Sequence, residues 1–182
     1  MRILLHICCA PCAIWPVDKM RQDGHELQGF FYNPNIHPYT EFKRRRDTLQ
    51  DYARSIELPV IFDGRYQLED FLQAVVHREQ NRCLYCYAMR LKAAAAVARR
   101  GRFEAFTSTL LVSPWQKHDL IRQLGEEIGR ATGVPFYYED WRPGYKQATA
   151  VSRQLNLYRQ PYCGCIYSEK ERYYRGPEVD KA

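Results

Sequence analysis

Short apolar runs rich in β-branched residues alternate along the chain with longer stretches that mix charged and apolar positions. The apolar runs predict five strands, at residues 3–7, 27–32, 60–62, 103–109 and 134–138. The stretches between and after them predict helices over 13–22, 39–55, 68–77, 84–100, 115–132, 145–155 and 167–174. This alternation is typical of an α/β fold with a doubly wound parallel sheet. We predict one such domain over residues 1–176 and a C-terminal tail at 177–182.

The end of the first predicted strand is the first candidate site. In an open parallel sheet, ligands bind beyond the carboxyl ends of the strands, and the common split order makes strands one and four neighbours. Nucleotide-binding relatives carry a glycine-rich phosphate loop after strand one. Here neither G-x-G-x-x-G nor G-x-x-x-x-G-K-[ST] occurs, and cysteines follow Ile7 instead. The use of ATP or NAD is therefore not supported.

All the cysteines lie in three short groups, C-C-x-x-C, C-x-x-C and C-x-C. They are seven in number: Cys8, Cys9, Cys12, Cys83, Cys86, Cys163 and Cys165. An odd number of clustered cysteines argues against a disulfide framework and favours metal ligands or redox thiols. Four would fill one 4Fe-4S cluster or one structural zinc site, and the surplus suggests a second metal or a redox-active pair. A structural zinc with spare thiols and a thioredoxin-like dithiol at Cys83 and Cys86 are the alternatives.

Composition adds a class of partner. Lys and Arg number 27 against 21 Asp and Glu, the net charge is +6, and 14% of residues are aromatic. Cations that hold phosphates and rings that stack on bases favour a nucleic-acid partner. The sequence has no run of about 18 apolar residues and no signal-peptide cleavage pattern near its start. These features predict a cytoplasmic protein without a membrane partner.

Other polar residues lie next to a cysteine group or at the same edge of the predicted sheet. Tyr158, Arg159 and Gln160 precede the C-x-C group, so that stacking and phosphate-binding side chains adjoin candidate ligands. In that group Gly164 permits a tight backbone that aims both thiols at one site. The rigid loop at 33–38 follows the second predicted strand, at the same sheet edge.

Less specific candidates have simpler interpretations. The basic run 43–46 is interpreted as a solvated helix face. We interpret His6, inside an apolar strand, as a core histidine and not as a ligand. Asp18 and Asp140 could act as an acid or a base, although no spacing requires it.

Five segments in order carry a family resemblance: LLHICCAPC, FFYNPNIHPYTEFKRR, RCLYCYAMRL, FTSTLLVSPWQ and YRQPYCGCIYS. Together they resemble the metal-dependent epoxyqueuosine reductases of the QueH family, over about residues 3–168. The resemblance implies reduction of epoxyqueuosine at the tRNA wobble position to queuosine. It further implies a 4Fe-4S cluster, an additional single metal ion that we expect to be iron, and an external electron donor such as a ferredoxin or flavodoxin. The fold implied is similar to nucleotide-binding adenine-nucleotide-hydrolase-like domains, with metal-binding cysteines in place of the phosphate loop.

The resemblance also suggests roles for individual residues. We expect all seven cysteines to bind metal, with Cys9, Cys83, Cys86 and Cys163 holding the cluster. The catalytic single ion would then be held by Cys8, Cys12 and Cys165. Substrate contacts are expected from Asn33, Asn35, Arg45, Ser113, Tyr158, Arg159 and Tyr162. The basic run and Arg153 would add contacts to anticodon-loop phosphates, and Trp115 is a further stacking candidate.

The chemistry of epoxide removal agrees with this assignment. Leaving an alkene requires two electrons and two protons, and an iron–sulfur centre can pass such electrons singly. Two other functions remain open on the sequence. An iron–sulfur tRNA sulfur-transfer enzyme would need an ATP loop, which is not found. A zinc-stabilised RNA-binding module would leave three cysteines unexplained.

Overall fold

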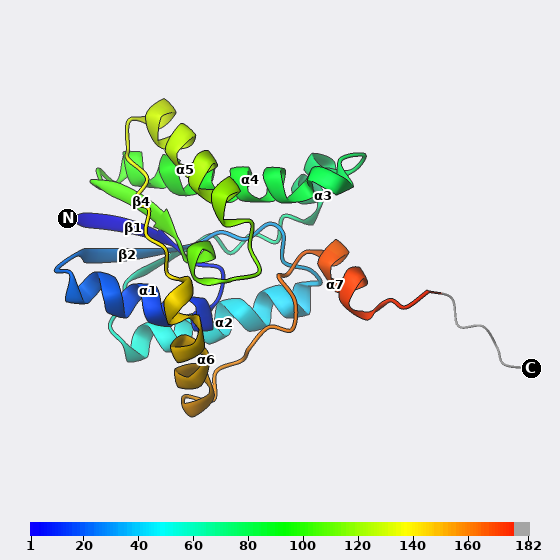
Figure 1. Cartoon of the computed structure of the whole chain (residues 1–182), viewed down its shortest axis with the longest axis horizontal. Helices are drawn as coiled ribbons and strands as arrows, with labels where there is room; N and C mark the ends of the chain where they lie inside the picture. The colour runs from blue at the N-terminus through cyan, green and yellow to red at the C-terminus, as the bar shows by residue number, and fades with distance from the viewer. Residues whose placement is uncertain (177–182) are drawn as a thin grey trace, which may run out of the picture.

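The computed structural model describes residues 1–176, and a four-stranded parallel sheet of order β3-β2-β1-β4 forms its centre (Figure 1). The strands are β1 (Arg2–His6), β2 (Glu26–Phe31), β3 (Val60–Phe62) and β4 (Ala105–Ser108). In the register, Leu5 lies opposite Gly29 of β2 and Thr107 of β4. The prediction that strands one and four are neighbours is confirmed.

The predicted fifth strand at 134–138 does not form. This segment touches the sheet through one bridge between Phe106 and Phe136. The Phe106 N–H donates to the Pro135 carbonyl, and the Tyr137 N–H donates to the Phe106 carbonyl. In this register Tyr138, the last residue of the predicted strand, would lie opposite Ser108 at the end of β4, but no second bridge forms there. The sheet therefore has four strands and not five.

Helices cover both faces of the sheet, as the doubly wound prediction requires. The α-helices are α1 (Ala10–Gln22), α2 (Tyr39–Ser55), α3 (Leu68–Val75), α4 (Arg82–Arg100), α5 (His118–Thr132), α6 (Tyr145–Gln154) and α7 (Ile166–Tyr173). The 3-10 helices are η1 (Glu79–Asn81), η2 (Thr109–Val112) and η3 (Arg142–Gly144). Figure 1 shows α4 and α5 on one side of the sheet and α1, α2 and α6 on the other.

The first helix begins earlier than predicted, at Ala10 instead of Ala13. Cys9 is its extended N-cap residue, and Pro11 fits the first turn because that turn needs no N–H from it. Two of the first three cysteines therefore belong to the start of α1 and not to a loop.

The core fixes the exit of β1. Ile3, Leu4 and Leu5 are fully buried, as expected of a central parallel strand covered on both faces. Leu91 of α4 and Ala13 of α1 belong to the same apolar core. The carboxyl end of β1, where the cysteines begin, thus lies on a rigid support.

Within residues 1–176, no helix combines the length and apolar character that crossing a membrane requires. The predicted tail at 177–182 lies outside the described residues.

Candidate metal centre

Three thiols converge where β1 leaves the sheet. The Cys8 N–H donates to Thr109 Oγ1 at 3.2 Å, which ties this exit to the end of β4. The Sγ atoms of Cys8 and Cys9 lie 3.7 Å apart, and those of Cys9 and Cys12 lie 2.8 Å apart. All three lie within 4.8 Å of one another. Two thiolates on one tetrahedral ion at about 2.3 Å stand about 3.8 Å apart. The Cys8–Cys9 distance matches this spacing, and the sulfurs of Cys9 and Cys12 would move apart to share an ion.

The charge of this triad concentrates on one sulfur. Hydrogen bonds from the thiols of Cys12 and Cys9 hold the pKa of Cys8 well below its usual value, and the Thr109 hydroxyl adds to this effect. Interaction with Cys8 raises the pKa of Cys12 well above its usual range, and burial raises that of Cys9. A cation that binds here displaces the remaining thiol protons.

A glutamine closes the triad from the far end of the chain. Gln160 Nε2 lies 2.8 Å from Cys9 Sγ and 3.5 Å from Cys12 Sγ. Its Oε1 atom is buried and has no hydrogen-bond partner within the described residues. Gln160 was expected only as a neighbour of the C-x-C group and was not predicted as a site residue. Its position before that group was the available signal.

The other four cysteines form a second group. Cys83 and Cys86 lie in the first turns of α4, and Cys165 is the N-cap residue of α7. Cys86 and Cys165 pack in one apolar cluster with Phe71. Burial raises the pKa of Cys86 to about 12, and the charges of Cys163, Cys165 and Cys83 contribute. Four thiols from two distant segments therefore face a common region.

The C-x-C turn depends on its central glycine. Gly164 has φ +113°, and a Cβ atom there would lie 2.9 Å from Ile36 Cγ1 and 3.1 Å from Arg45 Nη1. Its carbonyl accepts the His37 N–H at 2.8 Å. The loop at 33–38 thus forms a support for this turn, and the predicted need for a tight glycine backbone is confirmed.

Arg45 corrects two predictions made for the basic run. It is only 2% exposed and pairs with Glu41 at 2.6 Å. Its guanidinium donates to the carbonyls of Cys163 at 3.1 Å and Tyr162 at 3.0 Å. Because it lies on the inward stripe of α2, it holds the C-x-C turn and is neither solvated nor available to a phosphate.

The rest of the run is on the surface. Lys43 and Arg46 pair with Asp47, and the Arg44 guanidinium lies 3.8 Å from the centre of the Tyr158 ring. The interpretation of the basic run as a solvated helix face therefore holds for three of its four cations.

The predicted substrate residues occupy different environments. Asn33 and Asn35 are buried, and their Oδ1 atoms have no partner among residues 1–176. Asn33 Nδ2 donates to the Ile7 carbonyl at 2.9 Å, directly before the triad. Ser113 accepts the N–H of Trp115, whose side chain is 83% exposed. Arg159 is exposed beside Gln160.

Both predicted tyrosines are hydrogen-bonded to protein. Tyr158 donates its hydroxyl proton to Glu41 at 2.5 Å, and Tyr162 donates to the His37 carbonyl. Burial, first of all, raises the pKa of each to about 12. Both hydroxyl groups therefore keep their protons at neutral pH and brace the C-x-C turn.

Three other titratable candidates are not part of the centre. His6 Nδ1 contacts Ser108 Oγ at 2.8 Å and Nε2 contacts the Tyr32 carbonyl at 3.0 Å, which confirms the core-histidine interpretation. Asp18 accepts from the Gln22 amide. Asp140 pairs with Arg142 at 2.6 Å. No catalytic role follows for either carboxylate.

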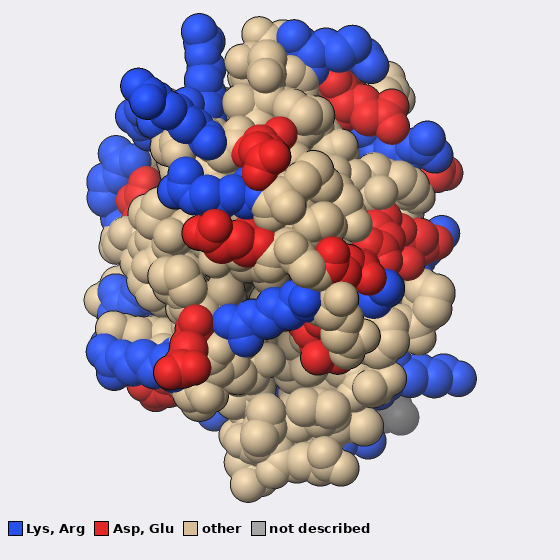
Figure 2. Space-filling model, turned by 90° about the vertical axis from the view of Figure 1, so that its left-hand side faces the viewer, with Lys and Arg blue, Asp and Glu red and all other residues tan. Residues whose placement is uncertain are grey.

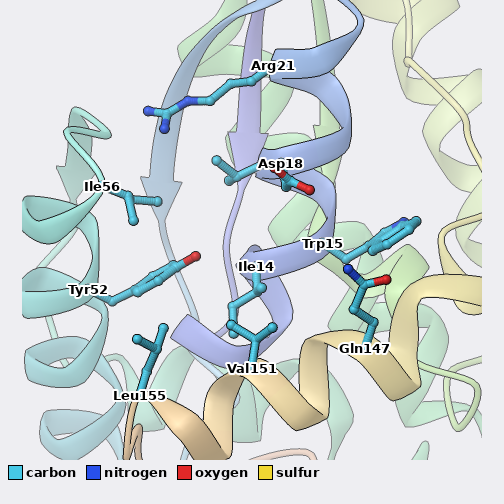
Figure 3. Close-up of a pocket in the computed structure, with 10 residues that line it drawn as sticks. Ile14, Trp15, Asp18, Arg21, Tyr52, Ile56, Gln147, Val151 and Leu155 are labelled. Carbon is cyan, nitrogen blue, oxygen red and sulfur yellow. The ribbon is translucent and has the colours of Figure 1, made fainter.

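The cavity in Figure 3 is separate from the cysteines. It has a volume of about 350 Å³ and lies between α1, α2 and α6. Figure 3 shows Ile14, Tyr52 and Val151 turned toward one another across it, with Arg21 at its far end. Its lining contains no cysteine. It therefore offers no redox group.

Comparisons with known proteins agree with the motif order. The family model described as epoxyqueuosine reductase QueH matches residues 3–171. The epoxyqueuosine reductase QueH of Dehalococcoides mccartyi is 36% identical over 172 residues, 94% of each chain. That of Thermotoga maritima is 33% identical over 189 residues, covering 98% of this chain and 96% of the relative.

One solved structure shares the fold. It is a predicted subunit of tRNA methyltransferase from Methanocaldococcus jannaschii, with a TM-score of 0.53 and 10% sequence identity. The match covers 84% of this chain and 76% of that one. At this identity the likeness concerns the arrangement of the sheet and helices alone.

Proposed function

The chain belongs to the epoxyqueuosine reductase QueH family, and we propose that it carries out its reaction on a metal centre built from its seven cysteines. It is an epoxyqueuosine reductase, an oxidoreductase of tRNA queuosine biosynthesis. The observation that supports the metal centre is the convergence of thiols from three distant segments. Arg90 interacts with two of these segments. It donates a hydrogen bond to Cys86 Sγ, and the charge of Cys8 affects it electrostatically.

The reaction defines what the centre must supply. Both C–O bonds of the epoxide break, two electrons and two protons are consumed, an alkene remains and the oxygen leaves as water. No side chain is a source of such electrons. A 4Fe-4S cluster, when bound, supplies low-potential electrons one at a time.

The structure favours a different division of the cysteines from the one that the sequence suggested. We assign the cluster to Cys83, Cys86, Cys163 and Cys165, since four thiolates match the ligand count of a 4Fe-4S cluster. Cys8, Cys9 and Cys12 are then left for the single ion, which we expect to be iron. Cys9 moves to the single ion because its Sγ lies 2.8 Å from that of Cys12, one helical turn away.

The protein side of the centre orients these thiols. Thr109 and Gln160 donate to the triad, and Arg45 and Gly164 hold the turn that carries Cys163 and Cys165. Such partners of metal ligands fix their direction and strengthen metal retention.

The tRNA is expected at the cysteine-bearing end of the sheet. Figure 2 shows the opposite end, where β1 starts, and there cations and anions are interspersed. Arg159, exposed beside Gln160, is the side chain that we assign to a phosphate. Arg159→Ala should lower tRNA affinity and reduce the slope of log affinity against log salt by about 1. Arg100→Ala, at the far end of α4, is the control and should change neither the tRNA affinity nor its salt dependence.

The remaining expectations concern the setting of the reaction. Electrons would come from an external donor of the ferredoxin or flavodoxin class, and the protein would act in the cytoplasm. We also retain the likeness to adenine-nucleotide-hydrolase-like domains as a proposal, with cysteines at the place of the phosphate loop.

Metal analysis and a single reaction test the function together. Protein purified without oxygen should contain about four sulfides and more than four irons per chain. With a chemical reductant it should convert epoxyqueuosine in tRNA to queuosine, read by mass analysis of the digested nucleosides as the loss of one oxygen atom. A Cys83→Ser, Cys86→Ser double variant should lack the four sulfides and their irons, and it should not convert epoxyqueuosine. Zinc without sulfide, even after anaerobic reconstitution, would overturn the redox centre and favour the zinc-stabilised RNA-binding module.

A further inference from the structure

Arg90 is a buried cation whose partner is sulfur. Its side chain lies in α4, one turn after Cys86, and the residue is 3% exposed. Nη2 donates to Cys86 Sγ at 3.0 Å, and Nε donates to the Cys86 carbonyl at 3.1 Å. Within residues 1–176 it forms no ion pair with an Asp or Glu.

The guanidinium also feels the charge of Cys8, the first thiol of the triad. Burial by itself lowers the pKa of Arg90, but the negative charges of Cys86 and Cys8 outweigh it and the pKa is raised. Its nearest ring is Tyr87, with 5.6 Å between the guanidinium carbon and the ring centre. His6 is engaged elsewhere, because its ring nitrogens contact Ser108 Oγ and the Tyr32 carbonyl. Arg90 is therefore a buried cation whose direct anionic partner is the sulfur of Cys86.

A buried charge without a counter-ion is strongly unfavourable. Elsewhere in this protein the buried Arg45 meets that need with Glu41. For Arg90 the equivalent anions are the thiolates, and they are present in full only when the cysteines are bound to metal.

We propose that Arg90 is the counter-ion of the cysteine centre and raises its reduction potential, a role that rests on the proposed function. A positive charge and an N–H···S hydrogen bond stabilise the state with more negative charge on the sulfurs, which is the reduced state. In the step concerned, the cluster gains one electron from an external one-electron donor. Arg90 stays protonated throughout, so no proton moves.

The test compares charge with shape at one position. Wild type, Arg90→Gln, Arg90→Lys and, as control, Arg99→Gln on the exposed part of the same helix are reconstituted without oxygen. Iron and sulfide are counted, and the midpoint potential is measured by dithionite titration followed by electron paramagnetic resonance. In Arg90→Gln the reduced-to-oxidised ratio at a fixed potential should fall at least about tenfold, or about 59 mV for one electron. The potential of Arg90→Lys should stay closer to that of wild type, and the potential of Arg99→Gln should equal that of wild type.

Every other result separates the two claims. A cluster that assembles in Arg90→Lys but not in Arg90→Gln also supports the counter-ion. If the Lys and Gln variants load the cluster equally and also have equal potentials, or if neither loads it, the counter-ion role is overturned and the proposed function stays intact. A wild-type protein without labile sulfide overturns both.

Discussion

Gln160 Nε2 lies 2.8 Å from Cys9 Sγ, although 151 positions separate the two residues in the sequence. The contact joins the segment before the C-x-C turn to the start of α1. Its amide also reaches Cys12 Sγ at 3.5 Å, so one side chain orients two thiols of the triad.

Removing this amide should weaken the triad's hold on its ion. We expect Gln160→Leu to retain the single metal with an affinity lower by about 10–100-fold, the usual cost of losing a hydrogen-bond partner of a ligand. Competition with a chelator, followed by metal analysis, measures the change. Gln154→Leu, at the exposed end of α6, is the control. Equal retention in both variants would contradict the role given to Gln160.

The buried pair of Arg45 with Glu41 should matter for stability. Arg45→Met leaves Glu41 without its cation and two carbonyls without their donor, and breaking a buried pair costs about 3–5 kcal/mol. Arg44→Met removes only a contact with the Tyr158 ring, worth about 1 kcal/mol or less. Urea unfolding of the metal-free variants gives both values. Similar losses in the two would show that the burial of Arg45 is unimportant.

Gly164 should not tolerate a side chain. Gly164→Ala adds a clash with Ile36 to the strain of a positive φ, and the clash alone should cost about 1–3 kcal/mol. Gly24→Ala, also at positive φ but with nothing within 4 Å of the added atom, is the control for backbone strain. Unfolding and iron content per chain are compared. The prediction requires a greater loss of stability and of iron at position 164 than at position 24.

The Asp140–Arg142 pair predicts a pH dependence below neutrality. Hydrogen bonds from Arg142 lower the pKa of Asp140 from 3.8 to about 2. A carboxylate with a lowered pKa stabilises the folded state fully above 3.8, and this contribution is lost as the pH falls toward 2.

Because the Asp140 side chain is 37% exposed, solvent screening keeps the effect to about 1 kcal/mol or less. Asp140→Asn should therefore be less stable than wild type at pH 6 and equal to it at about pH 2. Unfolding curves at the two pH values measure this, with Asp51→Asn on the exposed face of α2 as control. A difference that persists unchanged at the lower pH would contradict the ion-pair explanation.

The features of this molecule that depend on local sequence pattern could be predicted from the sequence. Alternation of strand and helix predicts the doubly wound sheet, and the position of Cys8 after a buried strand predicts the site edge. The fifth strand was predicted wrongly because the apolar pattern at 134–138 does not reveal that this segment meets β4 at a single bridge.

Residues whose roles depend on distant partners were harder to predict. Arg45 resembles its charged neighbours in sequence, and only the carbonyls of Tyr162 and Cys163 distinguish it. Arg90 lies one helical turn after Cys86, a spacing that is visible in the sequence, but its burial depends on tertiary packing. The cysteine groups were found because their spacing is local. Their division into four and three depends on tertiary contacts that spacing does not encode.

The short helix α7 places Cys165 at its N-terminus, yet none of its eight residues is buried. Its attachment relies on the polar contacts of the C-x-C turn, on the pair between Arg82 and Glu171, and on the packing of Cys165 and Tyr167 against the Phe71 cluster. Segments held in this way detach at a small fraction of the free energy of global unfolding. We therefore expect the segment that carries Cys163 and Cys165 to open more easily than the sheet, so that a cluster bound by its thiols would also fasten this end of the chain.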